Sequence, residues 1–196
     1  MLSDPVLQWV LTLTFSATAV YASLRLFTDR KPLLIVGNVL HLVMSVVMVA
    51  MCWPWWSVLP AVPQTLFFSA GMVWFGAIAL LQARRRIPRA AVGGHSAWHQ
   101  VAHAVMMAAM VWMILAMPSG TNATAHSHHH GGLESWAATS GVAITAALAT
   151  AGVIFLVELI RCVRGRTTWL GHTGDVTSGM LMSFGMAAMC WPMITG

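Results

Sequence analysis

Six apolar stretches, each long enough to cross a lipid bilayer, constrain this chain more than any other feature of its sequence. A transmembrane helix needs about 20 mostly apolar residues to span a hydrocarbon core of about 30 Å. The six stretches are Val6–Leu26, Leu33–Trp53, Gln64–Ala83, Trp98–Met117, Trp136–Leu159 and Asp175–Met193. Only 8% of the 196 residues are charged, whereas about 25% are charged in a typical soluble domain. We therefore predict an all-α, polytopic membrane protein whose six helices are surrounded by lipid.

The basic residues predict how these helices are oriented. All Lys and Arg residues lie at or just past the ends of the first, third and fifth stretches, in three clusters: Arg25, Arg30 and Lys31; Arg84, Arg85, Arg86 and Arg89; and Arg161, Arg164 and Arg166. Basic loops remain in the cytoplasm, so we expect both termini to lie outside it. A nucleic-acid surface would combine such charges with aromatic or polar residues on a folded platform, so no nucleic-acid partner is expected.

The second, fourth and sixth stretches repeat one another without a gap. The second reads His41-x2-Met44-x3-Met48-x2-Met51-Cys52-Trp53-Pro54, and the sixth reads Gly179-x2-Met182-x3-Met186-x2-Met189-Cys190-Trp191-Pro192. The fourth reads His103-x2-Met106-x3-Met110-x2-Met113. Internal repeats of this kind indicate repeated structural units. We predict one domain over 1–196, made of three helical hairpins at about 1–57, 58–120 and 133–196 with an outer loop at 119–132.

On helices, the repeated methionines form three narrow stripes. At about 100° per residue, the spacing places the Met residues of each repeat on one face of its helix. If the stripes face one another, their side chains stack into rungs: His99 with Asp175, His41 with His103, Met44/Met106/Met182, Met48/Met110/Met186 and Met51/Met113/Met189. Thioether sulfur selects Cu(I), and imidazole also binds copper. Weak sites in series would let an ion pass from rung to rung.

Each of these residues also has a simpler interpretation. Methionine fills irregular gaps in apolar cores, and duplication would copy a packed core as readily as a metal site. His41 and His103 could tie helices together by hydrogen bonds, and Asp175 could cap the sixth helix. Cys52 and Cys190 hold matching places in the repeat. They are open to a disulfide, to thiolate ligation of a metal, or to a role as small apolar side chains.

Three further features lie outside the stripes. The predicted outer loop contains His126, His128, His129 and His130, a tract that could collect metal ions above the rungs or serve as a polar linker. Glu158 precedes Arg161 by three residues, which predicts an ion pair on one helix face. Gly71, Gly76, Gly141 and Gly152 on the odd-numbered helices predict close helix approach.

The segment His103-Ala-Val-Met-Met-Ala-Ala-Met-Val-Trp-Met, with His41-x2-Met44 before it, resembles a family of Met-rich multi-pass membrane proteins from actinobacteria. That family is catalogued as a domain of unknown function. The resemblance implies a bacterial cytoplasmic membrane and no particular activity. The Met-x3-Met spacing is also similar in kind to the methionine rings of eukaryotic copper-uptake trimers, which is an analogy between unrelated folds.

Three functions are compatible with these observations. The first is Cu(I) binding for passage or for delivery to a membrane cuproenzyme, with a periplasmic or extracellular metal donor. The second is a structural or assembly subunit without a cofactor, and the third is a redox protein with b-type haem between His41 and His103. An enzyme is not expected, because five acidic residues and one Tyr offer little material for acid–base or nucleophilic chemistry.

Overall fold

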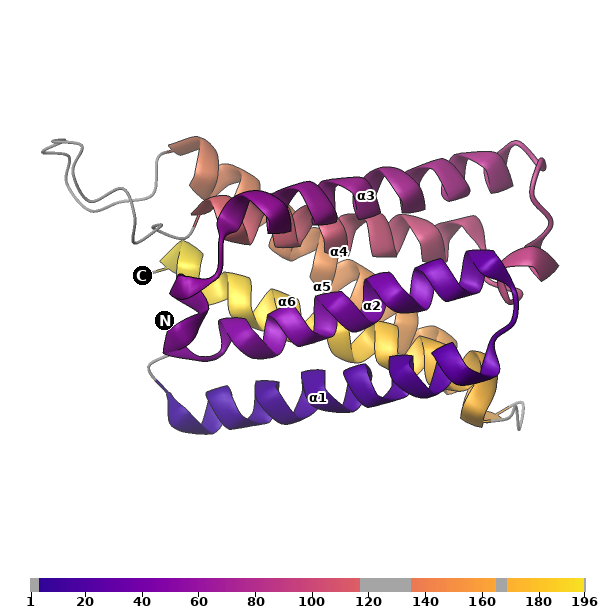
Figure 1. Cartoon of the computed structure of the whole chain (residues 1–196), viewed down its shortest axis with the longest axis horizontal. Helices are drawn as coiled ribbons and strands as arrows, with labels where there is room; N and C mark the ends of the chain where they lie inside the picture. Colours follow the sequence, from indigo (N-terminus) through magenta and orange to yellow (C-terminus); the bar gives the residue numbers. More distant parts are fainter. Residues whose placement is uncertain (1–3, 117–134, 165–168, 196) are drawn as a thin grey trace, which may run out of the picture.

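The computed structural model describes residues 4–116, 135–164 and 169–195, and within these ranges the secondary structure is helical, without strands. Six α-helices make up the body of the described chain (Figure 1): α1 (Pro5–Thr28), α2 (Pro32–Met51), α3 (Ala61–Ala83), α4 (Ala97–Ala116), α5 (Ser135–Arg164) and α6 (Gly174–Thr195). Short helical turns precede three of them: η1 (Pro54–Val58), η2 (Arg89–Val92) and η3 (Trp169–Thr173). The predicted all-α class is confirmed. The histidines of the outer loop, His126, His128, His129 and His130, lie outside the described residues.

Local signals explain where the first helices begin. The carboxylate of Asp4 accepts a hydrogen bond from the backbone N–H of Val6 at 2.9 Å, and Pro5 takes the first position of α1. Pro32 takes the same position in α2. A proline is tolerated there because the missing N–H would have no partner inside the helix. The apolar stretches seen in the sequence therefore become helices with bounds close to those predicted.

Five of the described helical segments are long and apolar enough to cross a membrane: Pro5–Thr28, Pro32–Met51, Ala61–Ala83, Arg89–Ala116 and Ala138–Arg164. The helix α6 is 22 residues long, but it carries Asp175 and several Gly, Ser and Thr residues, which lower its hydropathy. Large apolar side chains point outward along the bundle, such as Val6 at 69% exposure and Phe27 at 89%. Such surfaces are rare in water and are consistent with a lipid environment.

Consecutive helices pack against each other in pairs. The helix α1 packs along α2, α3 along α4, and α5 along α6, while a further contact between α1 and α6 brings the first and last helices together. Figure 1 shows α1 beside α2 and α3 beside α4 along the long axis, with α5 running obliquely behind them. We call the end that holds the α1–α2 and α3–α4 connections the basic end, because Arg30 and Arg84 to Arg89 lie there.

The predicted small-residue contacts are confirmed at three of four positions. A Cβ atom on Gly141 would stand 2.5 Å from the ring of Trp112 in α4, and one on Gly152 would stand 2.9 Å from Phe184 in α6. A Cβ on Gly71 would meet the sulfur of Met107 at 3.1 Å. The prediction for Gly76 is wrong. Nothing lies within 4 Å of a Cβ built there, because that face of α3 meets no described neighbour.

Candidate functional site

The methionine stripes of α2, α4 and α6 lie in one buried cluster, which we call the methionine core. Its members from the stripes are Met44, Met48, Met51, Met106, Met110, Met113, Met182, Met186 and Met189. The most exposed of them is Met51, at 8%. The packing of the six helices thus places these methionines of all three stripes in the interior. Whether three sulfur atoms meet at each predicted rung is a finer geometry that stays a prediction.

A methionine outside the stripes is buried as well. Met107 lies one residue beyond a stripe position of α4 and is also fully buried, against Gly71 of α3. Met72 lies off the stripes and is 37% exposed, and Met180 is partly buried beside the core. These off-stripe methionines provide matched controls for any test of the stripes.

The histidines of α2 and α4 meet at the end of the methionine core that faces the basic end. His41 Nε2 lies 3.2 Å from His103 Nδ1, and the two rings make an edge contact with centroids 4.4 Å apart. The repeat predicts this pairing, because the two residues hold the same position in their copies. Phe75 of α3 and Phe155 of α5 pack on His103 with ring centroids 5.2 Å and 6.2 Å away, so aromatic rings enclose one member of the pair.

The next pair toward the basic end differs from the prediction. Asp175 of α6 is paired with His95 rather than with His99, and the distance from His95 Nε2 to Asp175 Oδ2 is 3.0 Å. His99 instead stacks on His95, with ring centroids 4.2 Å apart and planes inclined by 26°. The helical register correctly placed His99 near this level of the bundle. It could not show that a loop residue would fold inward between the two side chains.

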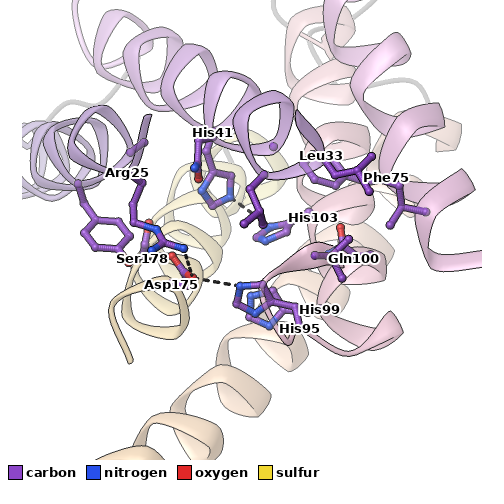
Figure 2. Close-up of a pocket in the computed structure, with 17 residues that line it drawn as sticks. Arg25, Leu33, His41, Phe75, His95, His99, Gln100, His103, Asp175 and Ser178 are labelled. Atoms are coloured by element: carbon purple, nitrogen blue, oxygen red, sulfur yellow. Dashed lines mark hydrogen bonds and ion pairs between the residues drawn. The ribbon is translucent and has the colours of Figure 1, made fainter. Parts of the chain in front are cut away.

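Asp175 is the centre of a polar cluster that joins three parts of the chain (Figure 2). Besides His95, its carboxylate accepts hydrogen bonds from the hydroxyl of Tyr21 at 2.7 Å and from the guanidinium of Arg25 at 3.2 Å. Arg25 also forms an ion pair with Asp29 at 3.2 Å. The carboxylate of Asp175 is therefore engaged with side chains of other elements, which goes well beyond capping its own helix.

The predicted ion pair between Glu158 and Arg161 is wrong. Glu158 Oε1 accepts a hydrogen bond from His172 Nε2 at 2.9 Å, and its Oε2 lies 4.0 Å from His99 Nδ1. Glu158 thus points from α5 toward the histidines of α4 and η3. His172 and His95 were not predicted as site residues. His95 precedes α4 and His172 precedes α6, and the Gly93–Gly94 pair before His95 was the signal available.

A small cavity lies among these polar side chains. Its volume is about 60 Å³, and it is lined by residues of α1, α2, α3, α4 and α6 and of the segment before α4, among them Arg25, His41, His95, His103 and Asp175. Figure 2 shows the imidazoles gathered around it, with His95 and His99 lying one over the other. A cavity of this size and polarity can hold water molecules.

The donor set limits how a metal ion could be held. Within the described ranges, no group of three or more His, Cys, Asp or Glu side chains is arranged to bind a metal. A metal in the bundle would therefore depend on methionine sulfur, alone or together with paired imidazoles. Cys52 and Cys190 are both buried free thiols, so the disulfide interpretation does not hold. Cys52 Sγ donates to the backbone carbonyl of Met48 at 3.3 Å.

Comparisons with known proteins place the chain in a family. Uncharacterized proteins of Mycobacterium tuberculosis (strain ATCC 25618 / H37Rv) and Mycobacterium bovis (strain ATCC BAA-935 / AF2122/97) are each 37% identical to it over 118 residues, which is 60% of this chain and 52% of theirs. The chain thus spans about half the length of the curated relatives it matches. No solved structure matches it. Residues 33–189, which include all the described stripe methionines, match the family described as "Domain of unknown function (DUF5134)", and the chain belongs to this family.

Proposed function

We propose that this protein binds copper(I) inside its helical bundle and passes it along the methionine core and the His41–His103 pair. The observation that supports this proposal is the shared burial of the stripe methionines from three helices in one cluster, capped on one side by two imidazoles in contact. A ladder of weak sites requires soft donors at matching depths on the three helices, and the repeated methionine spacing of α2, α4 and α6 supports that arrangement.

Ligand chemistry favours a soft monovalent ion. Methionine sulfur and imidazole nitrogen are neutral ligands that suit Cu(I). Transferring an ion into an apolar interior is costly, and the cost is lower for one charge than for two. Methionine-only sites bind weakly, which is what passage requires, because an ion held too tightly at one rung would not reach the next.

The proposal includes a topology and a cellular setting. All six helices, α6 included, would cross a bacterial cytoplasmic membrane with both termini outside, since the basic residues gather at one end of the bundle. The loop with His126, His128, His129 and His130 would then face outward as a collector of metal ions. A periplasmic or extracellular metal donor and a membrane cuproenzyme are the proposed partners.

The haem alternative requires a different arrangement of α2 and α4. Two axial histidines lie on opposite faces of a porphyrin, whereas His41 and His103 are in direct contact at 3.2 Å. The alternative of an assembly subunit without a cofactor rests on the fact that Met107, off the stripe, is as deeply buried as its neighbours. Burial alone therefore does not separate a ligand from a packed side chain.

A matched pair of triple variants separates these possibilities. Purified protein is titrated with Cu(I) against a competing chelator. In one variant the stripe residues Met48, Met110 and Met186 are replaced by Leu, and in the control the off-stripe residues Met72, Met107 and Met180 are replaced by Leu. Both variants lose three sulfur atoms and keep similar volumes.

We expect the stripe variant to lose at least about tenfold in Cu(I) affinity, equivalent to about 1.4 kcal/mol, and the control to bind as the wild type does. Equal affinity in all three proteins would leave the methionine core as packing only. Copper content of the protein purified from its native membrane provides an independent check.

A further inference from the structure

One ring nitrogen in the polar cluster is buried without a partner. The side chain of His95 is 9% exposed, and its Nδ1 atom has no hydrogen-bond partner among the described residues. A buried polar atom left unpaired costs free energy. Native proteins rarely leave such an atom unsatisfied without an unseen water or ion.

The opposite nitrogen of the same ring faces a carboxylate. His95 Nε2 lies 3.0 Å from Asp175 Oδ2, and because a carboxylate accepts hydrogen bonds, this contact places a hydrogen on Nε2. In a neutral imidazole, the lone pair then lies on Nδ1. A histidine oriented by a carboxylate through its second nitrogen is the usual arrangement for a metal ligand.

The backbone around His95 is built to hold it in place. Gly93 and Gly94 adopt φ values of +71° and +88°, a region that residues with a Cβ rarely enter. A Cβ on Gly93 would also stand 3.3 Å from the His95 ring. The side-chain amide of Gln82 in α3 donates to the His95 carbonyl at 3.0 Å. The loop before α4 therefore fixes this imidazole against α6.

His95 continues the line of candidate ligands from the methionine core toward the basic end. Ring centroids are 4.4 Å apart between His41 and His103, 5.1 Å between His103 and His99, and 4.2 Å between His99 and His95. All four line the cavity of about 60 Å³. The positive charge of Arg25, which also lines it, is compensated by Asp29 and Asp175 at 3.2 Å each.

From this geometry we propose that His95 Nδ1 binds copper(I) at a separate site, with the second ligand supplied from the cavity that His95 lines and with Asp175 as the residue that positions His95. The identity of the ion rests on the proposed function. Cu(I) is a closed-shell ion that accepts two ligands, so the site does not require the three-residue groups that the described chain lacks. It lies where an ion leaving the methionine core would pass toward the basic end.

The test counts bound Cu(I) by chelator competition in the purified full chain. His95→Gln keeps a donor for Asp175 but removes the imidazole, and His95→Phe keeps a flat ring that can stack on His99. The control is His172→Gln, which removes a neighbouring, partly exposed imidazole. We expect both His95 variants to bind about one equivalent less than the wild type, and the His172 variant to bind the full number.

Each outcome separates this inference from the proposed function. If the His95 variants bind as many ions as the wild type, Nδ1 holds a water molecule and the inference is overturned, whatever the stripe variant does. If the Met48/Met110/Met186 variant binds normally while the His95 variants lose one equivalent, the His95 site stands and the methionine core fails. A second readout is ¹⁵N NMR of histidine with Ag(I) as a redox-inert probe. It should show an unprotonated Nδ1 on His95 that shifts when Ag(I) binds, and an unshifted signal would contradict the site.

Discussion

The imidazoles of His41 and His103 touch, with 3.2 Å between Nε2 of the first and Nδ1 of the second, and this contact joins α2 to α4 across the inside of the bundle. The two helices belong to different hairpins, since α2 packs mainly on α1 and α4 mainly on α3. A polar contact therefore links these two hairpins inside the bundle, in addition to the hydrogen bond from Lys31 Nζ to the Ala90 carbonyl at 2.6 Å near the basic end.

Replacing both members of this pair should destabilise the protein by less than the sum of the two single replacements. In His41→Leu, the His103 nitrogen loses its partner while its residue stays 8% exposed, which should cost about 1–3 kcal/mol. The double variant His41→Leu/His103→Leu should cost less than the sum of the two single variants, because no unpaired nitrogen remains. Unfolding of the four proteins in mild detergent measures the coupling. Strict additivity would show that the contact contributes nothing.

The contact between Gly141 and Trp112 predicts a large effect from a single methyl group. A Cβ on Gly141 would stand 2.5 Å from the Trp112 ring, and the ring is held by a hydrogen bond from its Nε1 to the Ser140 hydroxyl at 3.0 Å. Since the ring cannot move aside without losing that bond, Gly141→Ala should destabilise the protein by about 1–3 kcal/mol.

The matched control for this substitution is Gly76→Ala in α3, where nothing lies within 4 Å of the added atom. Alanine is the better helix former by about 1 kcal/mol, so this variant should be neutral or slightly more stable. Thermal unfolding of both proteins decides the matter, and equal melting temperatures would mean that α4 and α5 do not approach as closely as described.

Removing the charge of Asp175 should loosen the basic end of the bundle. Its carboxylate accepts from Tyr21, Arg25 and His95, and hydrogen bonds to charged groups contribute about 1.5–3 kcal/mol each. Asp175→Asn keeps the shape but weakens all three bonds, so we expect a loss of at least about 2 kcal/mol of unfolding free energy. Asp4→Asn is the control, because Asn caps a helix about as well as Asp does. Similar stabilities of the two variants would contradict a structural role for the cluster.

The parts of this site that the sequence predicts are those that depend on helical periodicity. The pairing of His41 with His103 and the burial of the methionine stripes follow from a repeat in which equivalent residues occupy equivalent faces. His95 and His172 were missed because they lie in connecting segments, whose path depends on Gly93, Gly94 and contacts with other helices. Glu158 was assigned to Arg161 because only neighbours along its own helix are visible in a sequence, whereas His172 approaches it from η3.

The proposed orientation predicts which sites a membrane-impermeant maleimide can reach in intact cells. Val58 is 83% exposed in η1, at the end of the bundle opposite the basic one, and Arg86 is exposed at the basic end. Because basic loops stay in the cytoplasm, Val58→Cys should be labelled in intact cells and Arg86→Cys only after permeabilisation. The native cysteines are buried, so the unmodified protein serves as the unlabelled control.

An epitope placed after Gly196 extends the same measurement to α6, whose hydropathy is lower than that of the other helices. If the epitope is accessible outside, all six helices cross the membrane. If Val58→Cys is labelled but the epitope is protected, α6 does not cross, and the third methionine stripe would have to reach the core from a helix that enters the membrane without spanning it.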